Sequence, residues 1–175
     1  DGCTFPDPCS CKYECPSGPV KCVYNAVTST CPDGYYCEDP NCQQGVCVRK
    51  GDNESPTRDL QCGCNGVTYW NTSVARKAGQ PVRSNGSCKG DLASRCGGLA
   101  PTPCPNGSTC NMQVAKKSEC GQSDSGGLCW GLPEKCPTVV IGGRAHACGP
   151  VGACGDECNA IRKALVWYDD NTCPQ

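Results

Sequence analysis

Cysteine is the residue type in this chain whose abundance most clearly indicates a chemical role. It makes up 22 of the 175 residues, and a fraction above about one tenth is typical of a disulfide scaffold. Structural zinc is the competing use, but zinc sites favour paired Cys-x₂₋₄-Cys knuckles, often with histidine. The chain has a single histidine, His146, and most of its cysteines are irregularly spaced. The pattern therefore predicts disulfides without a metal or other cofactor, and it predicts an ordinary loop position for His146.

A short motif that could indicate catalysis is Ser123-Asp-Ser-Gly-Gly127, which is similar to the segment around the nucleophile of serine proteases. That mechanism needs a histidine base held beside the serine. His146 is the one histidine of the chain, and the motif falls in a stretch rich in turn residues. We expect a chance match here and no enzyme.

The number of cysteines also predicts the compartment, because cytosolic thiols are kept reduced. Four Asn-x-Ser/Thr sequons give an independent indication of secretion; their asparagines are Asn53, Asn71, Asn85 and Asn106. The sequence begins at Asp1, as a mature product does once its signal peptide has been removed. We expect a secreted, extracellular glycoprotein that carries N-linked glycans.

Charge and hydropathy exclude two classes of partner. The chain has 16 Lys and Arg against 17 Asp and Glu, so no electrostatic attraction to nucleic acid is expected. Its longest apolar run, residues 164–168, is far shorter than the roughly 20 residues of a membrane span.

The spacing of the cysteines repeats along the chain. Cys31-Pro-Asp-Gly-x-x-Cys37 matches Cys104-Pro-Asn-Gly-x-x-Cys110, and both segments contain turn-forming residues. Residues 1–21, 22–95 and 96–175 hold four, eight and ten cysteines, even numbers that allow each part to close its own bridges. We predict a cysteine-rich arm over 1–21, a first module over 22–88, a linker over 89–95 and a second module over 96–175.

The elements that position these cysteines are expected to be short. Hairpins are predicted over residues 31–47 and 104–129, and a strand over 67–70 follows the Asn65-Gly66 turn. One short helix is predicted in each module, over 73–78 with Ser73 as its cap and over 159–167 with Trp167 on its buried face. The fold class is small and disulfide-rich, with little regular secondary structure.

The run Cys62-Gly-Cys-Asn-Gly-Val-Thr-Tyr-Trp-Asn71 resembles a Kazal domain, whose hallmark is C-G-x-(D/N)-G-x-T-Y-x-N-x-C. Ser73 stands at the place of the last cysteine. The preceding hairpin makes residues 22–88 similar to a follistatin-type module, and 96–173 resemble a divergent copy. In the family, the cysteine that opens the inhibitory loop pairs with the one after the asparagine. The resemblance therefore implies a Cys136–Cys158 bridge in the second module and the loss of both partners in the first.

The resemblance also implies inhibition of a serine protease by a rigid loop, with its specificity residue two positions after the opening cysteine. In the second module Cys136 opens the loop, and that position is Thr138. The first module has no counterpart of Cys136, and the matching position is Arg49, two residues after Cys47. However, the first loop lacks its bridge and carries the Asn53 sequon, and the second is long and contains Gly142-Gly143. We therefore expect a structural or binding role, as a subunit of an extracellular coat, matrix or filament. Its partners would be copies of itself or other extracellular proteins, with a serine protease as the alternative.

Overall fold

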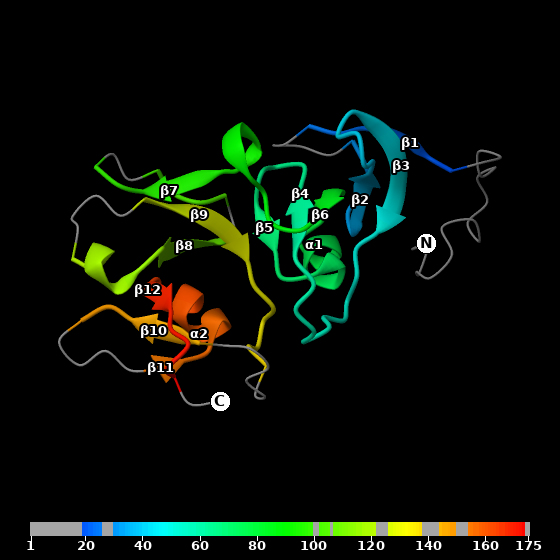
Figure 1. Cartoon of the computed structure of the whole chain (residues 1–175). Coiled ribbons are helices and arrows are strands. Elements are labelled where there is room, and N and C mark those ends of the chain that lie inside the picture. The colour runs from blue at the N-terminus through cyan, green and yellow to red at the C-terminus, as the bar shows by residue number, and fades with distance from the viewer. Residues whose placement is uncertain are drawn as a thin grey trace.

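The computed structural model describes residues 19–25, 30–99, 102–105, 107–121, 126–137, 144–149 and 154–173. Within them the protein consists of short strands and two short α-helices (Figure 1). Eighteen cysteines form nine disulfides, and no described cysteine is free. The small, disulfide-rich class is confirmed for these residues. The cysteines predicted for the arm over 1–21 lie outside them. No helix in the described ranges is long and apolar enough to cross a membrane.

The disulfides follow the same order in two parts of the chain. In each part the first cysteine pairs with the third, the second with the fifth and the fourth with the seventh. These bridges are Cys22–Cys37, Cys31–Cys47 and Cys42–Cys64, then Cys96–Cys110, Cys104–Cys129 and Cys120–Cys148. Cys62–Cys88 completes the first part, and Cys136–Cys158 and Cys154–Cys173 complete the second. No described bridge joins residues 22–88 to residues 96–173.

A three-stranded antiparallel sheet lies at one end of the molecule (Figure 1). Its strands are β1 (Lys21–Val23), β2 (Tyr35–Glu38) and β3 (Gln44–Arg49), in the order β1-β3-β2. The β2–β3 pair confirms the hairpin predicted over residues 31–47. Gly45 is required in β3, because a Cβ there would lie 2.1 Å from the carbonyl oxygen of Glu38.

The second sheet has nine strands and crosses both parts of the chain. They are β4 (Gln61–Gly63), β5 (Thr68–Tyr69), β6 (Val82–Asn85), β7 (Arg95–Gly97), β8 (Thr109–Val114), β9 (Gly126–Gly131), β10 (Ala145–Ala147), β11 (Cys154–Gly155) and β12 (Val166–Asp169). The order is β11-β10-β12-β8-β9-β5-β4-β6, and β7 also pairs with β9. The β8–β9 pair confirms the second predicted hairpin.

This sheet is more extensive than the sequence predicts, because two of its pairings are parallel and join distant segments. β5 pairs with β9, and β12 pairs with β8. A parallel pair needs a long crossover and leaves no turn signal in the sequence. The predicted linker over 89–95 is ordered as well: it holds the 3₁₀ turn Gly90–Leu92 and the start of β7. A second 3₁₀ turn spans Lys117–Glu119.

Both helices differ from their predicted bounds. α1 spans Thr72–Lys77 and is capped by Asn71, not by Ser73. α2 spans Glu157–Arg162 and is capped by Asp156. The prediction that this helix reaches Trp167 is wrong, because Ala164 turns the chain with a φ of 49° and Trp167 lies on β12.

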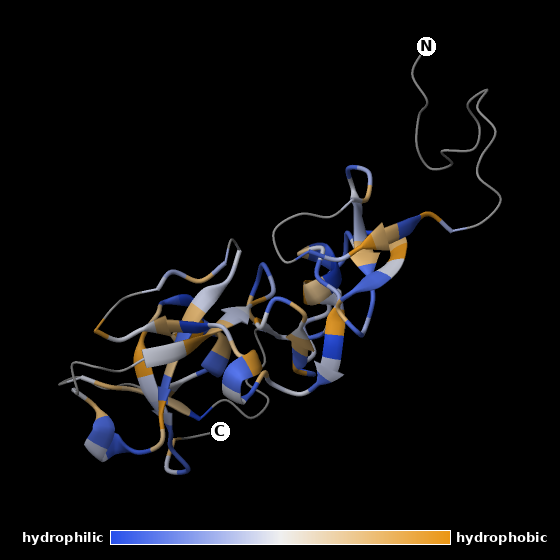
Figure 2. Ribbon diagram, turned by 90° about the horizontal axis from the view of Figure 1, so that it is seen from above, coloured by the Kyte–Doolittle hydropathy of each residue, from blue (hydrophilic) through white to orange (hydrophobic). Residues whose placement is uncertain are grey.

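The core is small and is built around aromatic residues. The three tryptophans, Trp70, Trp130 and Trp167, are at most 5% exposed and belong to one cluster with Ile161 and Val67. Figure 2 shows hydrophobic residues in short stretches alternating with hydrophilic ones along the ribbon. An interior of this size depends on the disulfides for much of its stability, because each bridge restricts the unfolded chain.

Candidate functional site

The N-terminus of α1 is closed by a buried asparagine. Asn71 is 5% exposed, and its Oδ1 accepts hydrogen bonds from the backbone N–H of Val74 at 3.0 Å and from the hydroxyl of Ser73 at 2.7 Å. This is the usual role of a helix N-cap, where a side-chain oxygen satisfies a backbone donor that has no partner within the helix. The Oδ1 atom is therefore fully used in holding the helix end.

The amide nitrogen of the same side chain holds a second segment, residues 54–58, which we call the strap. Asn71 Nδ2 donates to the carbonyl oxygen of Ser55 at 2.8 Å and to that of Thr57 at 2.6 Å. Trp70 Nε1 donates to the carbonyl oxygen between them, on Pro56, at 3.1 Å. The side chains of Trp70 and Asn71 thus hold three consecutive carbonyl oxygens by hydrogen bonds. The residues that carry these carbonyls, Ser55, Pro56 and Thr57, are exposed.

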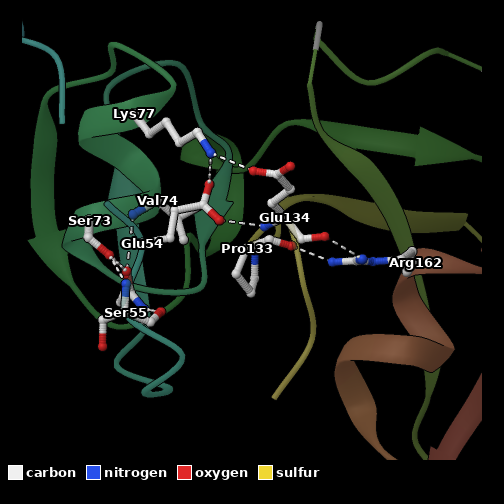
Figure 3. Close-up of polar contacts among 9 residues, drawn as sticks. Glu54, Ser55, Ser73, Val74, Lys77, Pro133, Glu134 and Arg162 are labelled. Carbon is white, nitrogen blue, oxygen red and sulfur yellow. Dashed lines mark hydrogen bonds and ion pairs between the residues drawn. The ribbon is translucent and has the colours of Figure 1, made fainter. Parts of the chain in front are cut away.

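Ser73 supplies a further hydrogen bond at the position where the Kazal pattern has a cysteine. The backbone N–H of Ser55 donates to Ser73 Oγ at 2.7 Å (Figure 3). In the second part of the chain, Cys158 holds the equivalent position, two residues after the cap of α2, and it is bonded to Cys136 with an S–S distance of 2.04 Å. This is the pair that the resemblance implies. A hydrogen bond in one part therefore stands where a disulfide stands in the other.

Both ends of the strap contact the second part of the chain. Glu54 forms an ion pair with Lys77 at 3.3 Å and accepts a hydrogen bond from the backbone N–H of Glu134, whose carboxylate also pairs with Lys77 at 2.9 Å (Figure 3). Arg162 of α2 in turn donates to the carbonyl oxygens of Pro133 and Glu134. The ammonium group lowers the pKa of the Glu134 carboxyl, and the two carboxylates raise the pKa of Lys77.

Arg58 makes the contact at the other end. Its guanidinium donates to both carboxylate oxygens of Glu157, at 2.6 and 3.0 Å, and its Cζ lies 5.6 Å from the centroid of a Trp70 ring. Planar, two-point pairing of this kind fixes orientation as well as distance. The strap thus joins α1 to α2 through a set of charged contacts that we call the clamp: Glu54, Arg58, Lys77, Glu134 and Glu157.

The predicted inhibitory positions lie elsewhere. Arg49 is in β3, where it pairs with Tyr35 of β2, and its guanidinium is 3.3 Å from Asp52. The sequence predicts a loop that starts after Cys47, but the sheet continues through this position. Thr138 lies outside the described residues. In the second part, Asp156 replaces Asn71 as helix cap, and a carboxylate has no N–H with which to hold carbonyls.

The sequon asparagines divide into two environments. Asn53 and Asn85 are exposed, whereas Asn106 lies outside the described residues. Asn71 is buried, and both N–H bonds of its amide point at carbonyls of the strap. A glycan on Nδ2 would replace one of these two N–H donors at a buried position, so the acceptor role predicted for Asn71 does not fit its contacts in this structure.

The sequence predicts a loop position for His146, but this residue lies on β10. Its Nδ1 lies 2.9 Å from Asp170 Oδ2, and its ring stacks on that of Tyr168. Two hydrogen bonds from Thr172, and then the neighbouring imidazole, lower the pKa of Asp170 to about 2. The residues before Gly126 in the Ser-Asp-Ser-Gly-Gly motif are largely outside the described part.

The strap is the feature that sequence reasoning missed, because its partners lie far along the chain. The available signal is the pair Asn71 and Ser73 in the Kazal pattern, which the sequence alone presents as a sequon and a missing cysteine. No protein-family model matches the chain, and no curated protein matches it.

Proposed function

We propose that the chain is a secreted, non-catalytic structural or binding protein, built from two follistatin-type, Kazal-like modules that act as one rigid unit. The observation that carries the proposal is the way in which residues 22–88 and 96–173 are joined. Thr68 and Tyr69 of β5 pair with Trp130 and Gly131 of β9, which makes one sheet of both parts. A subunit of an extracellular coat, matrix or filament needs this kind of fixed geometry between its contact surfaces.

The clamp supports the same conclusion. The segment most comparable to an inhibitory loop, the strap, is tied at both ends to α2 and to the segment before it. Its ion pairs are partly exposed, with side chains 13–44% accessible for Arg58 and Glu157, so each contributes modestly to stability. Their combined effect is geometric: they hold the strap against the molecule's own second part. Disulfides in this number and exposed sequons at Asn53 and Asn85 are consistent with an oxidising, extracellular setting.

Native material tests the proposal directly. We expect regular assemblies by electron microscopy and a mass by light scattering that exceeds 18.3 kDa plus glycans and rises with concentration. Intact mass before and after glycosidase treatment gives the glycan contribution, and we expect glycans among Asn53, Asn85 and Asn106 but not at Asn71. A strict monomer at all concentrations that also binds no extracellular protein would overturn the structural role.

A second function, inhibition of a serine protease, is favoured by one specific observation. Three successive carbonyls of the strap are restrained by Asn71 and Trp70 while the side chains above them are exposed. A segment held in one conformation before binding loses less entropy on entering an active site. This restraint supports Pro56 and Thr57 as the contact residues of an inhibitor, whereas Arg49 pairs with Tyr35 within a sheet.

The two functions separate in a titration against trypsin-, elastase- and subtilisin-like proteases at stoichiometric ratios. An inhibitor would lose activity on Pro56→Gly or Thr57→Gly and keep it on Arg49→Ala, the matched control in a paired strand. The structural role predicts no inhibition by any of these variants or by the wild type.

A further inference from the structure

One disulfide differs from the others in its exposure to solvent. Among the eighteen cysteines that the structure describes, Cys154 is the only one that is exposed; the rest are buried or half-buried. Its partner Cys173 is 4% exposed. The bridge between them joins β11, the last strand at one edge of the nine-stranded sheet, to the segment after β12. An external thiolate therefore meets Cys154 more readily than any other described bridge sulfur.

The same bridge lies beside the single histidine of the chain. His146 Nδ1 is 3.9 Å from Cys154 Sγ and 3.8 Å from Cys173 Sγ. Asp170 contacts the same nitrogen at 2.9 Å, and the Tyr168 ring lies parallel to the imidazole with centroids 5.0 Å apart. The only described cation close in sequence, Arg144, donates to Asn171.

We propose that Cys154–Cys173 is a thiol–disulfide exchange site, at which a small thiol such as glutathione attacks Cys154 and His146 stabilises the departing Cys173 thiolate. The attacking thiolate forms a new S–S bond to Cys154 Sγ as the Cys154–Cys173 bond breaks. The electron pair of the broken bond leaves on Cys173 Sγ, which the imidazolium faces and to which it gives its proton. The products are a mixed disulfide on Cys154 and a thiol at Cys173, so one disulfide is exchanged for another.

The direction of attack follows from burial and charge. Exchange rates rise when the attacked sulfur is accessible and when the leaving thiolate is stabilised. A positive group beside a sulfur is a general cause of such stabilisation. Because the chain has one histidine, we assign this neighbour to no other bridge among those that the structure describes. Opening the bridge leaves β11 held to β10 by only two residue pairs, Ala145 with Gly155 and His146 with Cys154.

The test uses the native, folded protein. It is incubated with reduced glutathione at pH 6, 7 and 9, quenched with an alkylating reagent and mapped by peptide mass analysis without reduction. We expect glutathione first on Cys154 and the alkyl group first on Cys173, with the other eight described bridges intact. Opening of any other bridge first would overturn the proposal.

The role of His146 has its own readout. His146→Gln should slow exchange about tenfold at pH 6, because the stabilisation of the leaving thiolate is lost. The difference should vanish at pH 9, where imidazoles are neutral. Lys163→Gln is the control: it removes one exposed positive charge from the same part of the chain, and it should leave the rate unchanged.

Bridge mapping of the unreacted His146→Gln protein checks its fold, and we expect the same nine described pairs. Equal rates for this variant and the wild type at pH 6 would overturn the assignment of His146. A loss that is the same at every pH would do so too, because it would indicate a structural effect.

Discussion

Replacing Asn71 by aspartate isolates the contact between α1 and the strap. The substitution keeps the size of the side chain and an oxygen that accepts from Val74 and Ser73, so the helix cap remains. It removes the two N–H donors that hold the carbonyls of Ser55 and Thr57 at 2.8 and 2.6 Å.

The expected cost follows from those two contacts. Each hydrogen bond contributes about 1 kcal/mol net, and a buried carbonyl left facing another oxygen loses a further amount of similar size. We therefore expect Asn71→Asp to lower the free energy of unfolding by about 2–4 kcal/mol at pH 7. The loss should shrink below pH 4, where a protonated carboxyl regains one donor.

Unfolding in guanidinium chloride, with disulfides intact, measures this loss. Tryptophan fluorescence is a suitable signal because Trp70 donates to the strap at Pro56. Asn85→Asp is the matched control: it makes the same chemical change, also removes one sequon, and lies at an exposed position, so its effect should stay within about 0.5 kcal/mol. A loss for Asn71→Asp no larger than the control's would refute the role of Asn71 in holding the strap.

Three further perturbations address the clamp, the core and the acidic end of the pH range. Arg58→Lys keeps the charge but loses the two-point pairing with Glu157. Denaturant unfolding should show that the free energy of unfolding falls by about 1 kcal/mol. An unchanged value would mean that the two-point geometry does not contribute to stability. Ile161→Ala, at a position with 0% exposure, should cost about 2–4 kcal/mol, whereas Leu165→Ala, at 38% exposure, should cost far less; similar losses would contradict the assigned core. Hydrogen bonds from Thr172, and then His146, lower the pKa of Asp170 from 3.8 to about 2. A carboxyl group whose pKa is lower in the folded state stabilises that state above the unfolded pKa, and this contribution is lost as pH falls through the folded pKa. The free energy of unfolding should therefore drop between pH 4 and pH 2. Acid titration followed by circular dichroism should show a smaller drop for Asp170→Asn.

Local sequence signals predict the hairpins but not the strands that connect them. Pro-Asp-Gly and Pro-Asn-Gly each lie just before the first strand of an antiparallel pair, at equivalent places in the cysteine repeat. The Asn65-Gly66 turn likewise precedes β5, and Gly66 has a φ of +77°. The parallel pairs leave no comparable signal, since their partners lie tens of residues apart.

The bounds of α2 show how such distant pairing overrides local preference. Residues 159–167 have helical composition, yet the helix ends at Arg162. Val166, Trp167 and Tyr168 pair with Met112, Gln113 and Val114 of β8, and the indole of Trp167 donates to Asn111 at 2.8 Å. Pairing with β8 and burial of an indole favour a strand over the five further helical residues that the sequence predicts.

The strap could not be predicted from spacing alone for the same reason. Asn71 fits a sequon, a helix cap and a Kazal asparagine equally well in the sequence. Only its burial and its contacts with Ser55 and Thr57 distinguish these roles. The Cys136–Cys158 bridge is different, because the family resemblance implies this pair and the structure contains it.

The join between the two parts of the chain is tested most directly by amide hydrogen exchange at Trp70. Its backbone N–H donates to the carbonyl oxygen of Gly131 at 2.9 Å, across the β5–β9 pair. If both parts form one rigid unit, this amide exchanges as slowly as that of Cys129, which donates to Ser94. Rapid exchange at Trp70, with slow exchange retained at Cys129, would mean that the two parts move independently and would contradict the account.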